Sequence, residues 1–211
     1  MRVVIVTGGN SPSKELLDRY LKKDDFVIGV DKGCNCLYEN QIEPRVILGD
    51  FDSINGAVLD YYINKGITIE KFKPEKDYSD TDLAYRKAVE MGAKEVILFG
   101  ATGTRVDHML GNIGIMLKAL KDNIHLEIID DNNRIFLVDR STSLVGQEGS
   151  LISFHAVSEV VKNFTIKKAM YTLENYDMTL FEPRAICNVF LKDDIEISFY
   201  KGIIMVIYPN D

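Results

Sequence analysis

Short apolar runs alternate with helical patterns over the first 123 residues, and this alternation constrains the fold more than any other feature of the sequence. It predicts a parallel sheet covered by helices, because neighbouring parallel strands are joined by crossover connections that are usually helical. Ligands bind such a sheet beyond the carboxyl ends of its strands. We expect strands at residues 3–6, 26–30, 46–48, 67–72 and 96–99, and helices at residues 12–22, 34–40, 55–65, 80–91 and 107–121.

Beyond residue 123, short runs of β-branched and aromatic residues are separated by polar or glycine-containing segments. This pattern is typical of a β-sandwich or a small barrel. We therefore predict an α/β domain with a mainly parallel, Rossmann-like sheet at residues 1–125 and an all-β sandwich domain at residues 126–211. The expected strands of the second part are residues 126–129 (which fit either domain), 135–138, 151–154, 160–166, 185–191, 195–199 and 203–207.

Composition restricts the partners and the compartment. The 211 residues include 25 Lys and Arg against 32 Asp and Glu, a net charge of −7, so a nucleic-acid partner is not expected. The first apolar run is too short for a signal peptide, and no uncharged apolar stretch approaches the roughly 18 residues of a membrane helix. Three cysteines argue against a disulfide framework. We expect a cytoplasmic protein with no membrane partner.

Two carboxylates, Asp50 and Asp52, directly follow the strand expected at residues 46–48. Strand alternation would send both to one side of the sheet and Phe51 to the other. Two adjacent carboxylates repel each other, and a hard divalent cation relieves that repulsion. Mg²⁺ is typically held by one or two carboxylates together with phosphate oxygens and water. The alternative interpretation is an ordinary turn, in which Asp and Ser are common.

A second acidic cluster spans residues 76–82 and leads into the helix expected at residues 80–91. Helix capping explains part of it, with Ser79 or Asp80 as the N-cap and acidic residues in the first turn. Capping does not exclude a function. Asp77, Asp80 and Asp82 follow the next strand along the chain and would complete a metal site at the same edge.

A glycine turn at residues 100–108 follows the strand expected at residues 96–99 and precedes a helix. Glycines at a strand-to-helix turn present backbone N–H groups to an anion, and hydroxyls there can donate to it as well. Arg105 adds a guanidinium, whose paired N–H donors can bind phosphate. The segment is neither a Walker A loop nor a Gly-x-Gly-x-x-Gly motif. His108 fits a residue at the start of the helix better than a base.

Asp31 likewise ends a strand, before a glycine turn and a helix, although an Asp that caps an ordinary turn would look the same. Four strand-to-helix junctions therefore place acids, or an Arg-Asp pair, at one edge of one sheet. Chance explains any one of these junctions better than it explains all four. Together they predict Mg²⁺ and a polyphosphate at the sheet edge, and hence phosphoryl-type transfer.

The four segments in this order resemble the thiamine pyrophosphokinase (thiamine diphosphokinase) family. The family patterns are Asp-Gly-Gly-Ala-Asn-x-Leu-Tyr, Gly-Asp-Phe-Asp-Ser, Lys-Asp-x-Thr-Asp and Thr-Gly-x-Arg-x-Asp-His. Here they correspond to residues 31–38, 49–53, 76–80 and 102–108, and the resemblance covers the whole first domain. Lys32 and Cys34 depart from the first pattern, in which Gly and Ala stand.

The β domain resembles the family less closely. Residues 168–171 occupy the place of a Gly-Leu-Lys-Tyr/Trp-like segment, and Cys187-Asn188 occupies the place of a Ser-Asn segment. Cys187 stands for Ser, and Val189 for an acidic or polar residue. Tyr171 and Asn188 are therefore the implied thiamine contacts, although a tyrosine of the sandwich core fits the sequence of Tyr171 equally well.

Membership implies transfer of pyrophosphate from ATP to thiamine, giving thiamine diphosphate and AMP, with Mg²⁺ and a homodimer whose active site lies at the subunit interface. Asp77 becomes a candidate base, Arg105 stabilises the transferred group, and Asp107 fixes Arg105 or the cationic side of the substrate. The resemblance assigns Mg²⁺ to Asp50, Asp52 and Asp80, catalysis to Asp77, Asp80, Arg105 and Asp107, and ligand binding to Asp31, Thr102, Gly103, Arg105, His108, Asn112, Tyr171 and Asn188.

Two other functions are compatible with the motifs. One is another Mg²⁺-dependent nucleotidyl- or glycosyltransferase that uses the Asp-x-Asp pair and needs no thiamine contacts from the β domain. The other is a non-catalytic sensor of thiamine or nucleotide. The sequence disfavours a sensor, because all the expected metal carboxylates are present.

Overall fold

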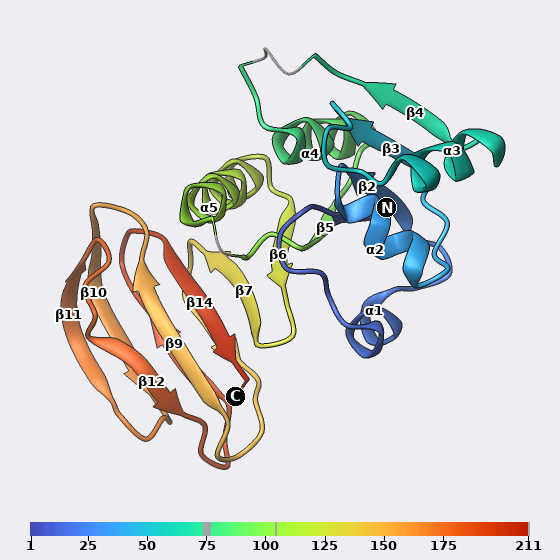
Figure 1. Cartoon of the computed structure of the whole chain (residues 1–211). Helices are drawn as coiled ribbons and strands as arrows, with labels where there is room; N and C mark the ends of the chain where they lie inside the picture. The colour runs from blue at the N-terminus through green and yellow to red at the C-terminus, as the bar shows by residue number, and fades with distance from the viewer. Residues whose placement is uncertain (74–76, 104, 211) are drawn as a thin grey trace. The chain divides into compact units, whose positions relative to one another are not determined.

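The structure, a computed structural model, describes residues 1–73, 77–103 and 105–210 (Figure 1). The chain divides into two compact units, Met1–Asp131 and Asn132–Asp211. We predicted domains at residues 1–125 and 126–211 but left the strand at residues 126–129 open to either one. This strand, β6 (His125–Ile129), pairs in parallel with β5 (Glu95–Phe99) of the first unit.

The first unit is a parallel sheet with helices, as the alternation predicts. Its strands run in the order β4-β3-β2-β1-β5-β6, and each pair of neighbours in this order is parallel. All the predicted strands and helices of this part are confirmed, with ends that differ by one or two residues. The remaining strands are β1 (Arg2–Val6), β2 (Phe26–Val30), β3 (Val46–Gly49) and β4 (Thr68–Lys71), and the helices are α1 (Lys14–Tyr20), α2 (Gly33–Glu39), α3 (Gly56–Asn64), α4 (Asp80–Glu90) and α5 (Val106–Lys121).

Both faces of the central strand β1 are buried. Val3, Val4, Ile5 and Val6 are each no more than 1% exposed. Val4 and Val6 belong to a cluster with side chains of α1 and α2, such as Leu17. Helix α4 packs on β1, β2 and β3. Two covered faces explain why these strands are continuous apolar runs rather than alternating ones.

The order of the strands reverses at β1. The chain proceeds from β1 through β2 and β3 to β4 on one side, and returns to place β5 and β6 on the other. Ligands of open α/β sheets bind at the carboxyl ends of the strands at such a switch point. The loops that follow β1 and β5 are therefore the expected floor of a binding site.

The second unit consists of antiparallel strands in the orders β7-β14-β9-β12 and β11-β10-β13-β8. Both sets contribute to one core, for example Phe154 from β9 and Phe164 from β10, whose rings meet edge to face. The strands are β7 (Asn133–Val138), β8 (Thr142–Leu144), β9 (Leu151–Ala156), β10 (Val160–Lys167), β11 (Leu173–Thr179), β12 (Ala185–Val189), β13 (Ile195–Ser198) and β14 (Ile204–Pro209).

Strands β8 and β11 were not predicted. β8 has only three residues, and β11 (Leu-Glu-Asn-Tyr-Asp-Met-Thr) contains no β-branched residue before its last position. It also lies at the end of its strand order, next to β10 alone, and only its Met178 is buried. A strand whose residues are mostly exposed carries little of the hydrophobic pattern by which strands are recognised.

The cysteines are free thiols, as expected, with Cys34 and Cys36 buried and Cys187 exposed. Burial raises the pKa of Cys34 to about 12, so this thiol stays protonated and unreactive. Within the described ranges, no helix combines the length and the apolarity needed to cross a membrane.

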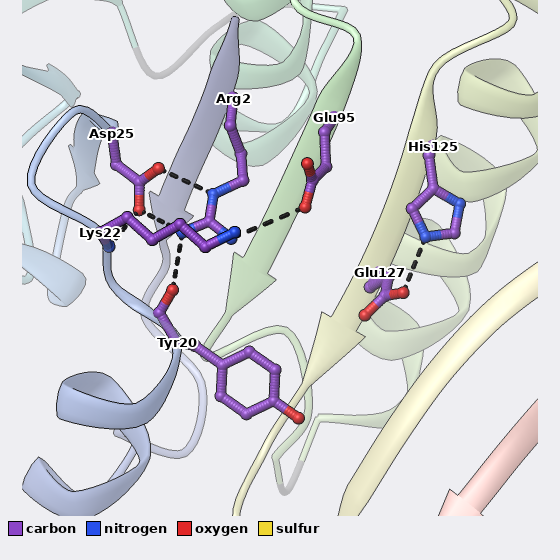
Figure 2. Close-up of polar contacts among 7 residues, drawn as sticks. All are labelled: Arg2, Tyr20, Lys22, Asp25, Glu95, His125 and Glu127. Atoms are coloured by element: carbon purple, nitrogen blue, oxygen red, sulfur yellow. Dashed lines mark hydrogen bonds and ion pairs between the residues drawn. The ribbon is translucent and has the colours of Figure 1, made fainter. Parts of the chain in front are cut away.

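The amino edge of the first sheet carries a partly buried ion pair, which Figure 2 shows. The guanidinium of Arg2 donates from Nε and Nη2 to the two carboxylate oxygens of Asp25, at 2.7 and 2.6 Å. Nη2 also donates to the carbonyl of Tyr20, and Nη1 lies 3.6 Å from Glu95. Burial alone would raise the pKa of Asp25, but the bonds from Arg2 and the Lys22 amide hold it below its ordinary value of 3.8.

Replacement of Asp25 by asparagine is expected to lower the free energy of unfolding by about 1–3 kcal/mol, since the mutation removes the nearer of the two carboxylates that pair with a partly buried guanidinium. The folded pKa is below the unfolded one, so this contribution is present above the unfolded pKa and disappears as the pH falls through the folded value. Urea unfolding of both proteins between pH 2 and pH 7 measures it.

The matched control is Asp18→Asn, which breaks a solvent-exposed pair between Lys14 and Asp18. We expect this change to cost less than about 0.5 kcal/mol. Two outcomes would contradict a stabilising role for the ion pair between Arg2 and Asp25. One is an equal loss of unfolding free energy in the two variants. The other is a difference in unfolding free energy between wild type and Asp25→Asn that stays the same at low pH.

Candidate active site

Asp50 and Asp52 lie on a turn, not on a continued strand. Strand β3 ends at Gly49, and Phe51 adopts a left-handed backbone with φ of 66°. The strand alternation by which we placed both carboxylates on one side therefore does not apply, because β3 ends before Asp50. Instead, the amide of Asp52 donates to Oδ1 of Asp50 at 3.0 Å, which keeps the two residues together. Asp50 is half-buried and Asp52 is exposed.

Asp31, at the end of β2, supports this turn from the neighbouring strand. Its Oδ1 accepts a hydrogen bond from the amide of Phe51 at 3.2 Å. A Cβ atom at Gly49, whose φ is 147°, would lie 1.7 Å from the same oxygen. Asp31 itself has φ of 44°, a conformation that side chains rarely adopt. Glycine at position 49 is thus required for the approach of the Asp31 carboxylate to the turn.

The second acidic cluster begins helix α4 as predicted. Ser79 is the N-cap and accepts a hydrogen bond from the amide of Asp82. Asp80 is the first helical residue and is half-buried, whereas Asp77 is exposed. In the first turn, the hydroxyl of Thr81 is hydrogen-bonded at 3.0 Å to that of Thr7, which follows β1. Lys76 lies outside the described residues.

The third carboxylate of this cluster, Asp82, is engaged by cations. Its side chain is 6% exposed, with Lys118 Nζ at 2.6 Å and Arg86 Nε at 3.1 Å. The guanidinium of Arg86 also lies 3.9 Å from the centre of the Tyr78 ring. Asp82 therefore joins α4 to α5 through Lys118, and it holds Arg86, whose guanidinium stacks on Tyr78.

The glycine turn after β5 is hydrogen-bonded to the loop after β1. Amides of the loop after β1 donate to carbonyls of the glycine turn after β5. The Gly9 amide donates to the carbonyl of Gly100 at 2.8 Å, and the Asn10 amide donates to that of Thr102 at 2.7 Å. A Cβ atom at Gly9 would lie 2.1 Å from the carbonyl oxygen of Thr102. The two loops of the switch point thus form one joined floor. Sequence reasoning missed the loop after β1, although its Gly8-Gly9 pair was the available signal.

Arg105 and Asp107 form an exposed ion pair at the start of α5. Nε and Nη2 of Arg105 donate to the two oxygens of Asp107 at 3.2 and 2.5 Å. The hydrogen bond from Arg105 lowers the pKa of Asp107 to about 2, so the carboxylate is charged at neutral pH. Both side chains are about two-thirds exposed, and Arg105 can therefore be reached by an anion from solvent.

The two other predicted residues of α5 differ in environment. His108 is exposed in the first turn of the helix. Asn112 is 7% exposed, and its Nδ2 donates to the carbonyl of Ala101 at 2.7 Å. The Asn112 amide is thus a support for the glycine turn, while His108 is free to face a ligand in solvent.

Within the part of the chain that the structure describes, no group of three or more His, Cys, Asp or Glu side chains converges as a metal cage. Mg²⁺ does not require one, because it typically uses one or two carboxylates plus substrate phosphate oxygens and water. The adjacent hard oxygen donors of Asp50 and Asp52 fit that requirement.

In the second unit, the two candidate thiamine contacts, Tyr171 and Asn188, are hydrogen-bonded to each other. Asn188 Nδ2 donates to the carbonyl of Tyr171 at 2.7 Å, and the amide of Tyr171 donates back to Asn188 Oδ1 at 3.0 Å. Asn188 is 2% exposed, whereas Tyr171 is 61% exposed and is not part of the core. Both line an open pocket of about 560 Å³ that also includes Glu182 and Arg184.

A parallel sheet whose carboxyl edge combines joined glycine loops, an exposed arginine and adjacent carboxylates belongs to the class of phosphoryl-transfer enzymes. Comparison with known proteins makes the class specific. Residues 17–128 match the family model "Thiamin pyrophosphokinase, catalytic domain", and residues 137–204 match "Thiamin pyrophosphokinase, vitamin B1 binding domain".

The relatives agree over the full length. The thiamine pyrophosphokinase of Bacillus subtilis is 33% identical over 209 residues, which are 98% of each chain. The crystal structure of the Bacillus subtilis protein covers all of both chains with a TM-score of 0.90 and 32% identity. That from Geobacillus thermodenitrificans has a TM-score of 0.87 and 30% identity, covering 100% of this chain and 98% of the other. The chain belongs to the thiamine pyrophosphokinase family and is an enzyme of that kind.

Proposed function

We propose that this chain transfers the terminal pyrophosphoryl group of ATP to the hydroxyl of thiamine, giving thiamine diphosphate and AMP. The observation that carries the proposal is that Asp50, Asp52 and Arg105 all follow strands at the carboxyl edge of one parallel sheet, the edge at which the two glycine loops are also hydrogen-bonded together. A new bond forms between the thiamine oxygen and the β-phosphorus, and the bond between that phosphorus and the oxygen bridging to the α-phosphorus breaks.

The carboxylates of Asp50, Asp52 and Asp80 are the proposed ligands of Mg²⁺. The bound ion would neutralise charge on the phosphate oxygens. The Asp52 amide bond to Asp50 and the Asp31 bond to Phe51 hold two of the three carboxylates in place before substrate arrives. Such preorganisation lowers the cost of reaching the transition state. In this arrangement Asp31 acts on the substrate through the turn that it supports.

The phosphates of ATP are proposed to bind the amides of Thr102 and Gly103, with Arg105 on the transferred group. Asp107 orients the Arg105 fork through two hydrogen bonds. His108 is proposed to contact the nucleotide, which its exposure in the first turn of α5 supports, and Asn112 to maintain the turn through its bond to Ala101. An anion at a strand-to-helix turn is favoured by the free N–H groups there.

The thiamine hydroxyl needs a proton acceptor as it attacks. Asp77 and Asp80 are the candidates, because both are carboxylates at the start of α4 and both have solvent access. The accepted proton then passes to solvent, and AMP leaves. Carboxylates around the site also attract the cationic thiazolium ring.

The second unit is the proposed thiamine-binding and dimerisation domain, with the active site at the interface between subunits of a homodimer. Its pocket at Tyr171 and Asn188 supports the first role. Exposed apolar side chains near that pocket, including Met170, Phe181 and Ile186, support the second. We class the first unit as Rossmann-like on its strand order and the second as a β-sandwich on its shared core. The free cysteines support a cytoplasmic location.

The proposed reaction is tested by incubating the purified protein with thiamine, ATP and Mg²⁺ and separating the nucleotides. We expect AMP and thiamine diphosphate in equal amounts, and no AMP when thiamine is omitted. Release of ADP would indicate a simple kinase, release of pyrophosphate a nucleotidyltransferase, and binding of thiamine without turnover a sensor. Each of these three outcomes contradicts the proposal.

A further inference from the structure

Two adjacent carboxylates, Asp130 and Asp131, follow strand β6 at the carboxyl edge of the first sheet. They belong to none of the four motifs, and the catalytic family model ends at residue 128. The hydroxyl of Thr102 donates to Oδ2 of Asp130 at 2.7 Å. The amide of Ser13 donates to Oδ2 of Asp131 at 3.1 Å, and the Ser13 hydroxyl donates to Oδ1 of the same residue. Successive residues thus hold the loops after β5 and after β1.

Thr102 is fixed at two points. Its carbonyl accepts from the amide of Asn10, and its hydroxyl is bound to Asp130. A hydrogen bond to a charged carboxylate is about twice as strong as one between neutral groups. A β-branched side chain also has few χ1 rotamers, so fixing the hydroxyl fixes the backbone to which it is attached. The orientation of the peptide between Thr102 and Gly103 is determined in this way.

We propose that Asp130 is a positioning residue for the phosphates of ATP, acting through Thr102. This inference rests on the proposed function of the glycine turn. A carboxylate cannot bind a polyphosphate directly, because like charges repel. Asp130 instead accepts the Thr102 hydroxyl proton and holds the turn with its amides available to the anion.

The test uses Asp130→Ala, which removes the acceptor, and Asp130→Asn, which keeps one side-chain oxygen. We expect the alanine variant to raise the KM for ATP about ten-fold, the change that corresponds to 1.4 kcal/mol. The kcat and the KM for thiamine stay near the wild-type values, because the reacting groups are untouched. The asparagine variant returns the KM for ATP to within about three-fold of wild type, a difference below 1 kcal/mol.

The matched control is Asp122→Ala. It removes a comparable bond, from the Tyr85 hydroxyl to Asp122 Oδ2 at 2.6 Å, at the other end of α5. We expect this variant to lower the melting temperature without raising the KM for ATP. A second route to the same loss is Thr102→Val, which removes the donor. Its effect should match that of Asp130→Ala, and the double variant should be no worse than either single one.

Equal KM values for ATP in Asp130→Ala and Asp122→Ala overturn the proposal, as does a loss in Asp130→Ala that appears only in kcat. An asparagine variant no better than alanine also overturns it. Calorimetric titration with the non-hydrolysable analogue α,β-methylene-ATP and Mg²⁺ separates this inference from the function. If wild type binds the analogue but makes no AMP from ATP and thiamine, the proposed function fails. The role of Asp130 is then still tested by the affinity of its variants for the analogue. If wild type does not bind the analogue, both fail.

Discussion

Replacement of Asp52 by asparagine is expected to lower kcat about 100- to 1,000-fold, the usual cost of losing one electrostatic contact to a transition state. Asparagine keeps the size of the side chain but not its charge, and the charge is what a hard cation requires. The fold should be unaffected. The Asp52 side chain is exposed, and the bond that fixes the turn comes from its backbone amide to Asp50, which asparagine retains.

Steady-state kinetics at saturating thiamine and ATP, with thermal unfolding in parallel, measure this effect. Asp60→Asn is the matched control, because it removes an exposed carboxylate from α3 of the same unit. We expect it to leave kcat unchanged. An Asp52→Asn enzyme with near-normal turnover would remove Asp52 from the active site, and a large fall in its melting temperature would assign the residue to the fold instead.

Replacement of Gly9 by alanine is expected to have the second large effect, on both stability and ATP binding. The new Cβ atom would lie 2.1 Å from the carbonyl oxygen of Thr102 and 2.3 Å from that of Gly100. Both contacts are with backbone, so no side chain can rotate away. The two loops must separate, which breaks the bonds from Gly9 to Gly100 and from Asn10 to Thr102.

Overpacking of this kind costs about 1–3 kcal/mol, and for a chain of this size each kcal/mol lowers the melting temperature by roughly 2–4 °C. The KM for ATP should also rise by at least about ten-fold, since the glycine turn loses its partner. Gly114→Ala in α5 is the control, because a Cβ there meets nothing within 4 Å. It should stabilise the protein by about 0.5–1 kcal/mol. A Gly9→Ala protein as stable and as active as wild type would contradict the conclusion that the loops after β1 and β5 must be hydrogen-bonded to each other for stability and ATP binding.

The order of elements in the first unit could be predicted from the sequence because burial on both faces leaves continuous apolar runs. Val3 to Val6 are an example. The strand ends were also predictable to within two residues, since Asp31, Asp50 and Gly100 interrupt the apolar runs where the strands stop. The motif residues lie at these same positions, where the apolar runs end. The residues of the candidate site could therefore be predicted from the sequence as residues that follow strands.

The contacts between those ends could not be predicted. Thr102 and Asp130 are 28 residues apart, and Gly9 lies more than 90 residues before the carbonyl that it approaches. Such contacts depend on the strand order β1-β5-β6, which local patterns do not contain. The left-handed φ of Phe51 was also missed, because large side chains rarely adopt that conformation and nothing in the residue type signals it.

The proposed reaction moves a pyrophosphoryl group, rather than a single phosphoryl group, and a label in the β-phosphate of ATP distinguishes the two transfers. With [β-³²P]ATP, thiamine and Mg²⁺, we predict that the label appears in thiamine diphosphate, that the AMP released is unlabelled, and that neither forms without thiamine. Label recovered in ADP, or in inorganic pyrophosphate, would contradict the proposed reaction.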